Sequence, residues 1–403
     1  MLHDPTRHEP LADTAWDAEA ARAAVAAIVR ELEDARLPDG GWPVHPLDEA
    51  GDTPPGGFKG MYLGRAGLLW ALGWLREAGL AAPRLDLGQA IDQAVADYAA
   101  APDSGDAVPS YFLGEAGLRL VQWRLTGSAA AAERLRALVE ANIAHPSNEA
   151  LWGSPGTMLA AWHLWRHTGD DAWRTLYRRN ARHQWDTWHW HEPSGCHLWT
   201  QDLYGKVVQY LGAGHGFAGN AFALLLGAEL LDADQRRELP QRVAQALACT
   251  ARHEGQAANW RPGLWAPRPG SPEMLMQWCH GAPGIVTATQ PLPPGTEPAL
   301  DALLCAAGEA VWQAGPLAKG PSLCHGTAGN GMALLALHAR TADPTWLARA
   351  RRFAMHAIAQ VDTARHLHGH GRHSLWTGDV GVAVFLAQCL DGTYRGMPLL
   401  DVV

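Results

Sequence analysis

One short pattern recurs seven times along this chain: a glycine, two residues, a second glycine and then an apolar run. The first glycines of the seven copies are Gly64, Gly114, Gly153, Gly216, Gly281, Gly326 and Gly378. Two glycines at this spacing are weak evidence alone, so the residues that follow them decide. In the first copy, leucines stand at i, i+1, i+4 and i+7 from Leu68, the spacing of a helix with a wide apolar face. Each copy therefore predicts an apolar helix that begins at its glycines.

Between the copies lie more polar segments with helical spacing. The Ala-rich residues 18–36 carry Val25, Ile28 and Leu32 on one side. Comparable segments are residues 90–101, 131–143, 235–253 and 346–361. Sustained alternation of apolar and polar residues is missing, so we expect no strands. The chain thus predicts a repeated pair, in which a polar outer helix is followed by an inner helix that begins at the glycines.

Such a helix pair buries its apolar face only against neighbouring pairs. Closing seven pairs into a ring would bury every inner helix, and the alternative is an open α-solenoid. We expect the ring, an all-α, seven-fold α/α toroid, with residues 1–403 as a single domain. Glycines in the first helical turn would let adjacent repeats approach closely and would bring the same turn of each inner helix to one mouth of the ring.

Composition excludes several classes of protein. The formal net charge of −9, with scattered Lys and Arg, argues against a nucleic-acid-binding surface. We see no apolar run of membrane-spanning length and no signal peptide in the first thirty residues. Six cysteines in 403 residues are no disulfide framework, which favours a reducing, cytoplasmic location. Most of the 19 tryptophans are expected in the core.

If all seven turns share one rim, the polar residues just before the glycines converge there. They are Glu149, Trp152, His215, Trp278, Cys279, His280, Cys324 and His325. Helix N-termini carry positive partial charge, which favours thiolates and lowers a thiol pKa. Two Cys and one or two His match the donors that zinc prefers. Three protein ligands would leave a catalytic position open, whereas four would make a structural site.

The remaining cysteines and a histidine-rich stretch have simpler interpretations. Cys196, Cys249, Cys305 and Cys389 lack a partner motif and are interpreted as packing residues. Four histidines between His366 and His373 suggest a second metal site, but a polar, Gly-rich loop that lends a substrate contact is the favoured interpretation.

Three blocks, "YLGAGHGFAGN", "WCHGAPG" and "LCHGTAGN", together with the seven-fold glycine repeat, resemble the lanthionine synthetase C-like (LanC-like) family over essentially the whole chain. The resemblance implies a seven-fold α/α toroid with one zinc ion. Its ligands would be Cys279, Cys324 and His325, with the fourth position left for water or a thiol. It also implies that His215 acts as an acid/base near the metal and that Glu149 orients this histidine.

The implied chemistry is the addition of a thiol to a dehydroalanine or dehydrobutyrine residue. Zinc would stabilise the thiolate, and His215 would protonate the α-carbon after attack on the β-carbon. In one branch of the family the thiol is glutathione, added to a dehydroamino acid in a peptide or protein. In the other, a cysteine of the substrate peptide closes a lanthionine ring. His280, in the Trp-Cys-His-Gly block, and Lys319 resemble the glutathione branch, and Arg372 is a third candidate for substrate binding.

The chain also departs from the family pattern. After Gly281 the stretch "QPLPPG" should stop the inner helix near Gln290. We expect no dehydratase or kinase-like module in the chain, so a peptide cyclase would need a separate dehydratase or kinase as partner.

Two other functions compete with an addition enzyme. A non-catalytic zinc- or glutathione-binding module would have no need of His215 and Glu149. A carbohydrate-active α/α barrel would require two carboxylates across a cleft, where this rim offers Cys and His.

Overall fold

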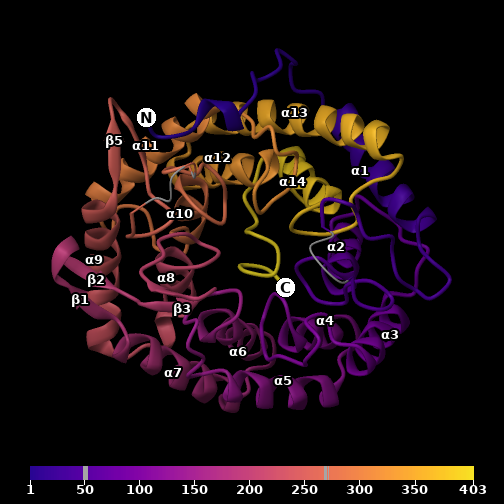
Figure 1. Ribbon diagram of the computed structural model, residues 1–403, viewed down its shortest axis with the longest axis horizontal. Coiled ribbons are helices and arrows are strands. Elements are labelled where there is room, and N and C mark those ends of the chain that lie inside the picture. Colours follow the sequence, from indigo (N-terminus) through magenta and orange to yellow (C-terminus); the bar gives the residue numbers. More distant parts are fainter. Residues whose placement is uncertain (49–52, 267–269, 271) are drawn as a thin grey trace.

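Two concentric layers of helices form a closed ring (Figure 1). The structure is a computed structural model that describes residues 1–48, 53–266, 270 and 272–403. Within these residues there are fourteen α-helices, seven in each layer. The predicted seven-fold α/α toroid is confirmed, and the open solenoid is excluded because the first helix packs against the last.

The inner helices begin one residue after the first glycine of each copy. They are α2 (Arg65–Glu77), α4 (Glu115–Thr126), α6 (Ser154–Thr168), α8 (Phe217–Leu226), α10 (Ala282–Ala288), α12 (Thr327–Thr341) and α14 (Asp379–Asp391). The outer helices are α1 (Ala18–Asp34), α3 (Leu87–Ala100), α5 (Ala129–Ala141), α7 (Asp171–Asp186), α9 (Ala233–Thr250), α11 (Pro298–Ala314) and α13 (Pro344–His368). The early end of α10 agrees with the predicted stop near Gln290.

The second glycine of every copy makes the same close approach. A Cβ on it would lie 1.8–2.3 Å from the carbonyl oxygen of the residue three positions before the first glycine. For Gly329 this is the Leu323 oxygen, at 1.8 Å. The side chain at that position in the preceding copy also faces the glycine. Gly117 faces Met61 in this way, and Gly67 faces Leu375 of the last copy, so the contact runs around the whole ring. Only glycine fits here, and the prediction that the glycines let repeats approach closely is confirmed.

The two layers start their helices differently. Six of the seven outer helices have a capping side chain, such as Asp17, which accepts from two amides of α1. Inner helices have a glycine cap, and amides of their first turn donate to carbonyls of the preceding loop, as Thr327 does to Gly320 (3.0 Å). These amides are thus already hydrogen-bonded. The positive partial charge that the sequence led us to expect at the rim is therefore weaker, because fewer N–H groups at the helix starts remain free.

The ring is closed by α1, which packs against α14. Glu31 of α1 accepts hydrogen bonds from His373 Nε2 (2.8 Å) and from the Gly371 amide (2.9 Å). The histidine-rich stretch therefore ties the two ends of the ring together. The interpretation of the whole stretch as a loop is wrong in part, because His366 and His368 lie in the last turn of α13 and the loop begins at Gly369.

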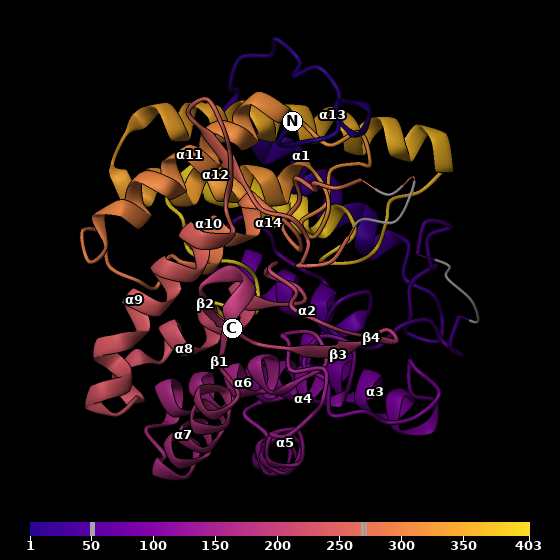
Figure 2. The same cartoon turned by 60° about the vertical axis from the view of Figure 1, so that its left-hand side comes forward.

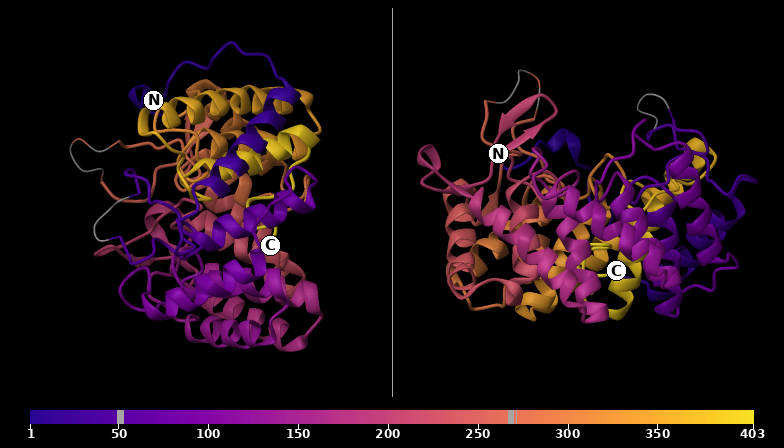
Figure 3. Two further views of the ribbon diagram at one scale, coloured as in Figure 1. Left: turned by 90° about the vertical axis from the view of Figure 1, so that its right-hand side faces the viewer. Right: turned by 90° about the horizontal axis from the view of Figure 1, so that it is seen from below.

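In the part of the chain that the structure describes, three short antiparallel hairpins interrupt the helices, where the sequence predicted no strands. They are β1 (His189–His191) with β2 (Cys196–Leu198), β3 (Gln201–Leu203) with β4 (Lys206–Val208), and β5 (Arg252–Glu254) with β6 (Ala257–Asn259). Three-residue strands are too short for an alternating pattern to appear. Figure 2 shows β3 and β4 running side by side, and the right-hand view in Figure 3 shows strands projecting from one face of the ring.

Nine of the 19 tryptophans are buried in the core, eight more pack against it half-buried, and only Trp190 is exposed (46%). The interpretation of Cys249 as a packing residue is wrong, because its side chain is exposed on α9. The last residues of the chain lie inside the ring (Figure 1), where Tyr111 Oη donates to the Leu399 carbonyl (2.6 Å). In the part of the chain that the structure describes, every helix is too short or too polar to span a bilayer.

Candidate active site

A belt of backbone hydrogen bonds runs around one mouth of the ring. Its members, here called the rim belt, stand two residues before the first glycine of each copy: Tyr62, Phe112, Leu151, Gly214, Cys279, Cys324 and Trp376. Six of the seven amides donate to the carbonyl of their counterpart in the next copy, and the amide of Leu151 is the exception. Cys279 donates to Cys324 (3.1 Å), Cys324 to Trp376 (2.8 Å), and Trp376 to Tyr62 (3.4 Å), which crosses the point of ring closure. The turns therefore share one rim, as the repeat predicted.

Two neighbouring members of the rim belt are the cysteines of the repeated Cys-His pairs. Ligand atoms of Cys279, Cys324 and His325 lie within 4.8 Å of one another, and this is the one such group of three found in the described residues. Both cysteines are buried, with 8% and 4% of their surface exposed. Because the two cysteines are adjacent members of the belt, residues 45 positions apart in sequence become neighbours.

The pKa values of the two thiols indicate whether this group suits a metal ion. Hydrogen bonds from Cys324 and His325 lower the pKa of Cys279 well below the usual value of a thiol, against the cost of burial. Burial and the nearby Cys279 sulfur raise the pKa of Cys324 well above it. Two thiolates this close repel each other, and a divalent cation between them is what allows both to ionise. Two sulfurs and an imidazole nitrogen form a donor set that suits zinc.

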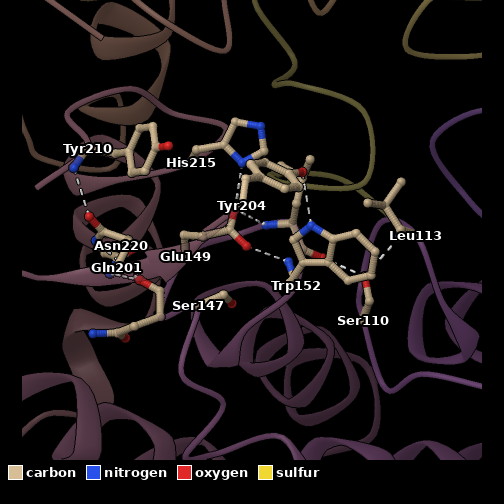
Figure 4. Close-up of polar contacts among 12 residues, drawn as sticks. Ser110, Leu113, Ser147, Glu149, Trp152, Gln201, Tyr204, Tyr210, His215 and Asn220 are labelled. Atoms are coloured by element: carbon tan, nitrogen blue, oxygen red, sulfur yellow. Dashed lines mark hydrogen bonds and ion pairs between the residues drawn. The ribbon is translucent and has the colours of Figure 1, made fainter. Parts of the chain in front are cut away.

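The rim belt is interrupted between Leu151 and Gly214. Here the Leu151 amide donates to Glu149 Oε2 (3.0 Å), and the Trp152 amide donates to Glu149 Oε1 (2.7 Å). The same Oε2 lies 3.0 Å from His215 Nδ1 (Figure 4). Glu149 is fully buried, and the His215 side chain is 16% exposed. The carboxylate thus replaces one link of the belt and fixes the histidine of the next turn.

This carboxylate controls the charge of His215. Burial alone would disfavour the imidazolium, but the hydrogen bond and the negative charge of Glu149 outweigh it, with a contribution from Cys279. The pKa of His215 is therefore raised above its usual value. The second ring nitrogen points away from Glu149 (Figure 4), so the proton it carries is available to a neighbouring molecule.

Aromatic rings surround the histidine. The centroid of the His280 ring lies 5.5 Å from that of His215, and the Tyr204 ring lies 5.7 Å away. Tyr204 Oη accepts a hydrogen bond from Trp152 Nε1 (3.1 Å), which holds the tyrosine over the Glu149–His215 pair. Burial lowers the pKa of His280, which favours the neutral form of this second imidazole.

Comparison with known proteins decides which family builds this rim. The family model described as "Lanthionine synthetase C-like protein" matches residues 59–401. The chain belongs to the lanthionine synthetase C-like family. All seven glycine copies and the whole rim belt lie within the matched residues.

Individual proteins match this chain over only part of its length or at low sequence identity. The chain is 32% identical over 208 residues to "Glutathione S-transferase LANCL1" of Danio rerio, which covers 48% of this chain and 46% of that protein. It is 30% identical over 152 residues to "LanC-like protein GCL1" of Arabidopsis thaliana, over 36% and 32% of the two chains. The matches thus span less than half of each relative. A solved structure named "Nisin cyclase" superposes with a TM-score of 0.65 at 15% identity, covering 95% of this chain and 98% of that one, which establishes a shared fold.

Within this LanC-like ring, the three predicted substrate contacts lie in different surroundings. Lys319 is exposed and lines a cavity of about 690 Å³. Arg372 lines the same cavity, but its guanidinium is paired with Asp48, with Nε 2.8 Å from Oδ2. His280 lines a separate cavity of about 250 Å³.

Two residues near the sulfurs escaped the sequence analysis. Tyr62 belongs to the rim belt, and its hydroxyl faces the Cys324 sulfur, whose pKa it lowers. Gln277 Nε2 donates to Cys279 Sγ (3.0 Å). Aligning the seven copies two residues before the glycine would have identified Tyr62, because it occupies the same position as both cysteines. Gln277 has no such signal.

Proposed function

We propose that this protein adds the thiol of glutathione to dehydroalanine or dehydrobutyrine residues of peptides or proteins and so forms a thioether. The observation that carries the proposal is the presence, on one rim, of a Cys-Cys-His group and an imidazole held by a buried carboxylate. A thiol addition requires a stabilised sulfur nucleophile and a proton donor, and these two groups supply them.

Cys279, Cys324 and His325 are the residues that would hold zinc. When bound, zinc would keep the substrate thiol in its thiolate form near neutral pH. The chain's own contribution is to present both cysteines from the rim belt and to stabilise their negative charge through Gln277 and Tyr62.

The reaction is balanced without any change of oxidation state. The thiol gives its proton to solvent, a carbon–sulfur bond forms at the β-carbon, and the electrons of the carbon–carbon double bond move onto the α-carbon and its carbonyl as an enolate. His215 then gives its proton to the α-carbon and regains one from solvent, so the net change is the addition of sulfur and hydrogen across the double bond. Glu149 keeps the imidazole protonated and correctly oriented until that step.

Glutathione is the thiol that the cavity at Lys319 favours. Its two carboxylates would be attracted to the exposed ammonium group, which lies five residues before Cys324. The relative from Danio rerio carries glutathione in its name, which supports the same choice. Arg372 would join only after exchanging Asp48 for a carboxylate of the ligand.

A lanthionine cyclase is the second candidate, and the fold shared with nisin cyclase favours it. In that case the thiol is a cysteine of the substrate peptide, and a separate dehydratase or kinase prepares the dehydroamino acid. A non-catalytic zinc- or glutathione-binding module is the third, and it leaves the Glu149–His215 pair without a role.

Mass spectrometry of dehydroalanine peptides separates these functions. A cysteine-free peptide incubated with the protein and glutathione should gain the mass of glutathione, and the gain should require His215. A cysteine-containing peptide that keeps its mass but loses its reactivity toward a thiol reagent would favour the cyclase. If neither peptide changes beyond the rate without protein, the catalytic proposal is wrong.

A further inference from the structure

The lysines of this chain have an unusual distribution. The sequence contains only three: Lys59, Lys206 and Lys319. Lys59 is fully buried, and its Nζ lies 3.5 Å from Asp103. The other two each line one of two separate cavities, Lys319 the larger cavity and Lys206 the smaller one that contains His280.

We propose that the smaller cavity binds the electrophile, as a polypeptide segment with an acidic side chain next to its dehydroamino acid. This rests on the proposed function and adds where each substrate enters: the peptide at Lys206 and the thiol at Lys319. The cavity measures about 250 Å³, and its polar lining includes Lys206, Tyr210, Arg261, Glu273 and His280.

The position of the cavity suits the electrophile because it adjoins the proton donor. Ring centroids of Tyr210 and His280, which line it, lie 6.3 Å and 5.5 Å from that of His215. An α-carbon placed against these rings is within reach of His215. The larger cavity, in contrast, is lined by residues from the Ser322 and Thr377 turns and lies on the side of Cys324.

Backbone hydrogen bonds fix the wall of the smaller cavity to the turn that carries His215. The Leu211 amide donates to the Pro262 carbonyl (3.0 Å), and the Leu264 amide donates to the Gln209 carbonyl (2.9 Å). Gly263 makes room for the Trp265 ring, since a Cβ there would lie 1.8 Å from it. The wall is therefore built into the framework of the site.

Charge selects the chemistry of the peptide. Arg261 is already neutralised by Glu273, with which it forms an ion pair. Lys206 Nζ lies 4.9 Å from the centroid of the Trp265 ring, and in the described residues it forms no ion pair with a carboxylate. An ammonium group held on an aromatic face beside a cavity attracts an anionic side chain of the ligand.

The β3–β4 hairpin, which carries Lys206, also supplies an apolar contact. Tyr204 stands at the turn between β3 and β4 with φ of 52°, a conformation that non-glycine residues rarely adopt. Its side chain is 65% exposed, yet its hydroxyl is held by Trp152. Val207, 68% exposed, follows on β4. The hairpin thus offers an apolar surface to a peptide that reaches His215.

Lysine footprinting tests the assignment directly, because Lys59 is fully buried and only the half-buried Lys206 and the exposed Lys319 can react. Reductive methylation, read by mass spectrometry, is carried out on wild-type protein alone, with glutathione, and with a dehydroalanine peptide that has Glu beside the dehydroalanine. The peptide should protect Lys206 severalfold and leave Lys319 reactive, and glutathione should do the reverse. A matched peptide with Gln in place of Glu should protect Lys206 less.

Kinetics of two matched variants provide the second measurement. Lys206→Met should raise KM for the Glu peptide about tenfold and abolish its advantage over the Gln peptide, with KM for glutathione unchanged. Lys319→Met should raise KM for glutathione and keep the preference for the Glu peptide. If the peptide protects Lys319 instead, or if Lys206→Met leaves the preference intact, the assignment is wrong.

These outcomes separate the inference from the proposed function. Protection of Lys206 by the peptide without any thiol addition would keep the subsite and contradict the catalytic proposal. Thiol addition with Lys206 unprotected and a Lys206→Met enzyme like wild type would keep the catalytic proposal and contradict the subsite.

Discussion

Two regions of the rim have the same backbone structure but different side chains. The first consists of the turns before α10 and α12, and the second of the turns before α14, α2 and α4. In both regions the rim-belt residue donates its amide to the next copy, and the second glycine faces a carbonyl. In the first region the side chains at this position are Cys279 and Cys324. In the second they are Trp376, Tyr62 and Phe112, whose rings pack on one another with centroids 5.3–6.4 Å apart.

The difference separates what the repeat supplies from what individual side chains supply. Glycines fix the backbone of every turn, and the residue two positions earlier decides whether that turn carries a candidate metal ligand or an aromatic ring. Variants at the shared glycines should therefore act alike in both regions, and variants at the rim-belt side chains should not.

The largest effect is expected for Cys324→Ala. We expect zinc content to fall to near zero and kcat/KM for thiol addition to fall about 10³-fold or more, because a ligand worth several kcal/mol is lost. Phe112→Leu, at the equivalent position of the aromatic region, should keep its zinc. Metal analysis measures the zinc content of both variants, and circular dichroism checks that they are folded. Stoichiometric zinc in folded Cys324→Ala would show that Cys324 is not a zinc ligand.

His215→Asn should reduce turnover about 10²- to 10³-fold, the usual contribution of a general acid, and should retain zinc. Rates of addition to a dehydroalanine peptide under saturating glutathione measure this effect. Wild-type turnover in the variant would assign the proton transfer to another group.

Gly329→Ala and Gly67→Ala lie in the two regions and should destabilise the protein alike, each by about 3 kcal/mol, because the new Cβ meets a backbone carbonyl. Gly88→Ala in α3 is the matched control, since its Cβ would have ordinary contacts of 3.4 Å or more. Chemical denaturation measures all three. A tolerated alanine at either repeat glycine would show that the close approach is not required there.

Glu149→Gln should shift the pH profile more than it lowers the maximum rate. The carboxylate raises the pKa of His215, so the acid form persists to higher pH in wild type and the rate declines as pH rises through that pKa. Without the charge, burial dominates and the declining limb should move to lower pH. An unmoved limb would mean that Glu149 does not set the charge of His215.

The smallest effect concerns the aromatic region, where Asp379 is 4% exposed. Burial raises its pKa to about 6. An unfolded Asp ionises near pH 4, so the protein should lose stability as pH rises from about 4 to about 6. Asp379→Asn should flatten this dependence, because the neutral amide does not ionise. Equal slopes for both proteins in thermal unfolding would show that Asp379 ionises freely in the folded state.

The sequence predicted the repeat and much of the rim, and the reasons are local. Glycine spacing and apolar periodicity identify inner helices, and residues just before a glycine share a turn in every copy. Cys279, Cys324 and His325 were therefore predictable as neighbours. The hairpins, the Asp48–Arg372 pair and the Lys206 cavity were not, because they depend on contacts between loops without a periodic signal. Tyr204 escaped because a turn residue with positive φ is not recognisable from its identity.

The central claim is that Cys279, Cys324 and His325 hold one zinc ion with a position left for a substrate thiol. X-ray absorption at the zinc edge of the purified protein tests it most directly. The account predicts two sulfur neighbours in the protein alone and three after glutathione is added. A zinc environment of nitrogen and oxygen only, or one that glutathione leaves unchanged, would contradict it.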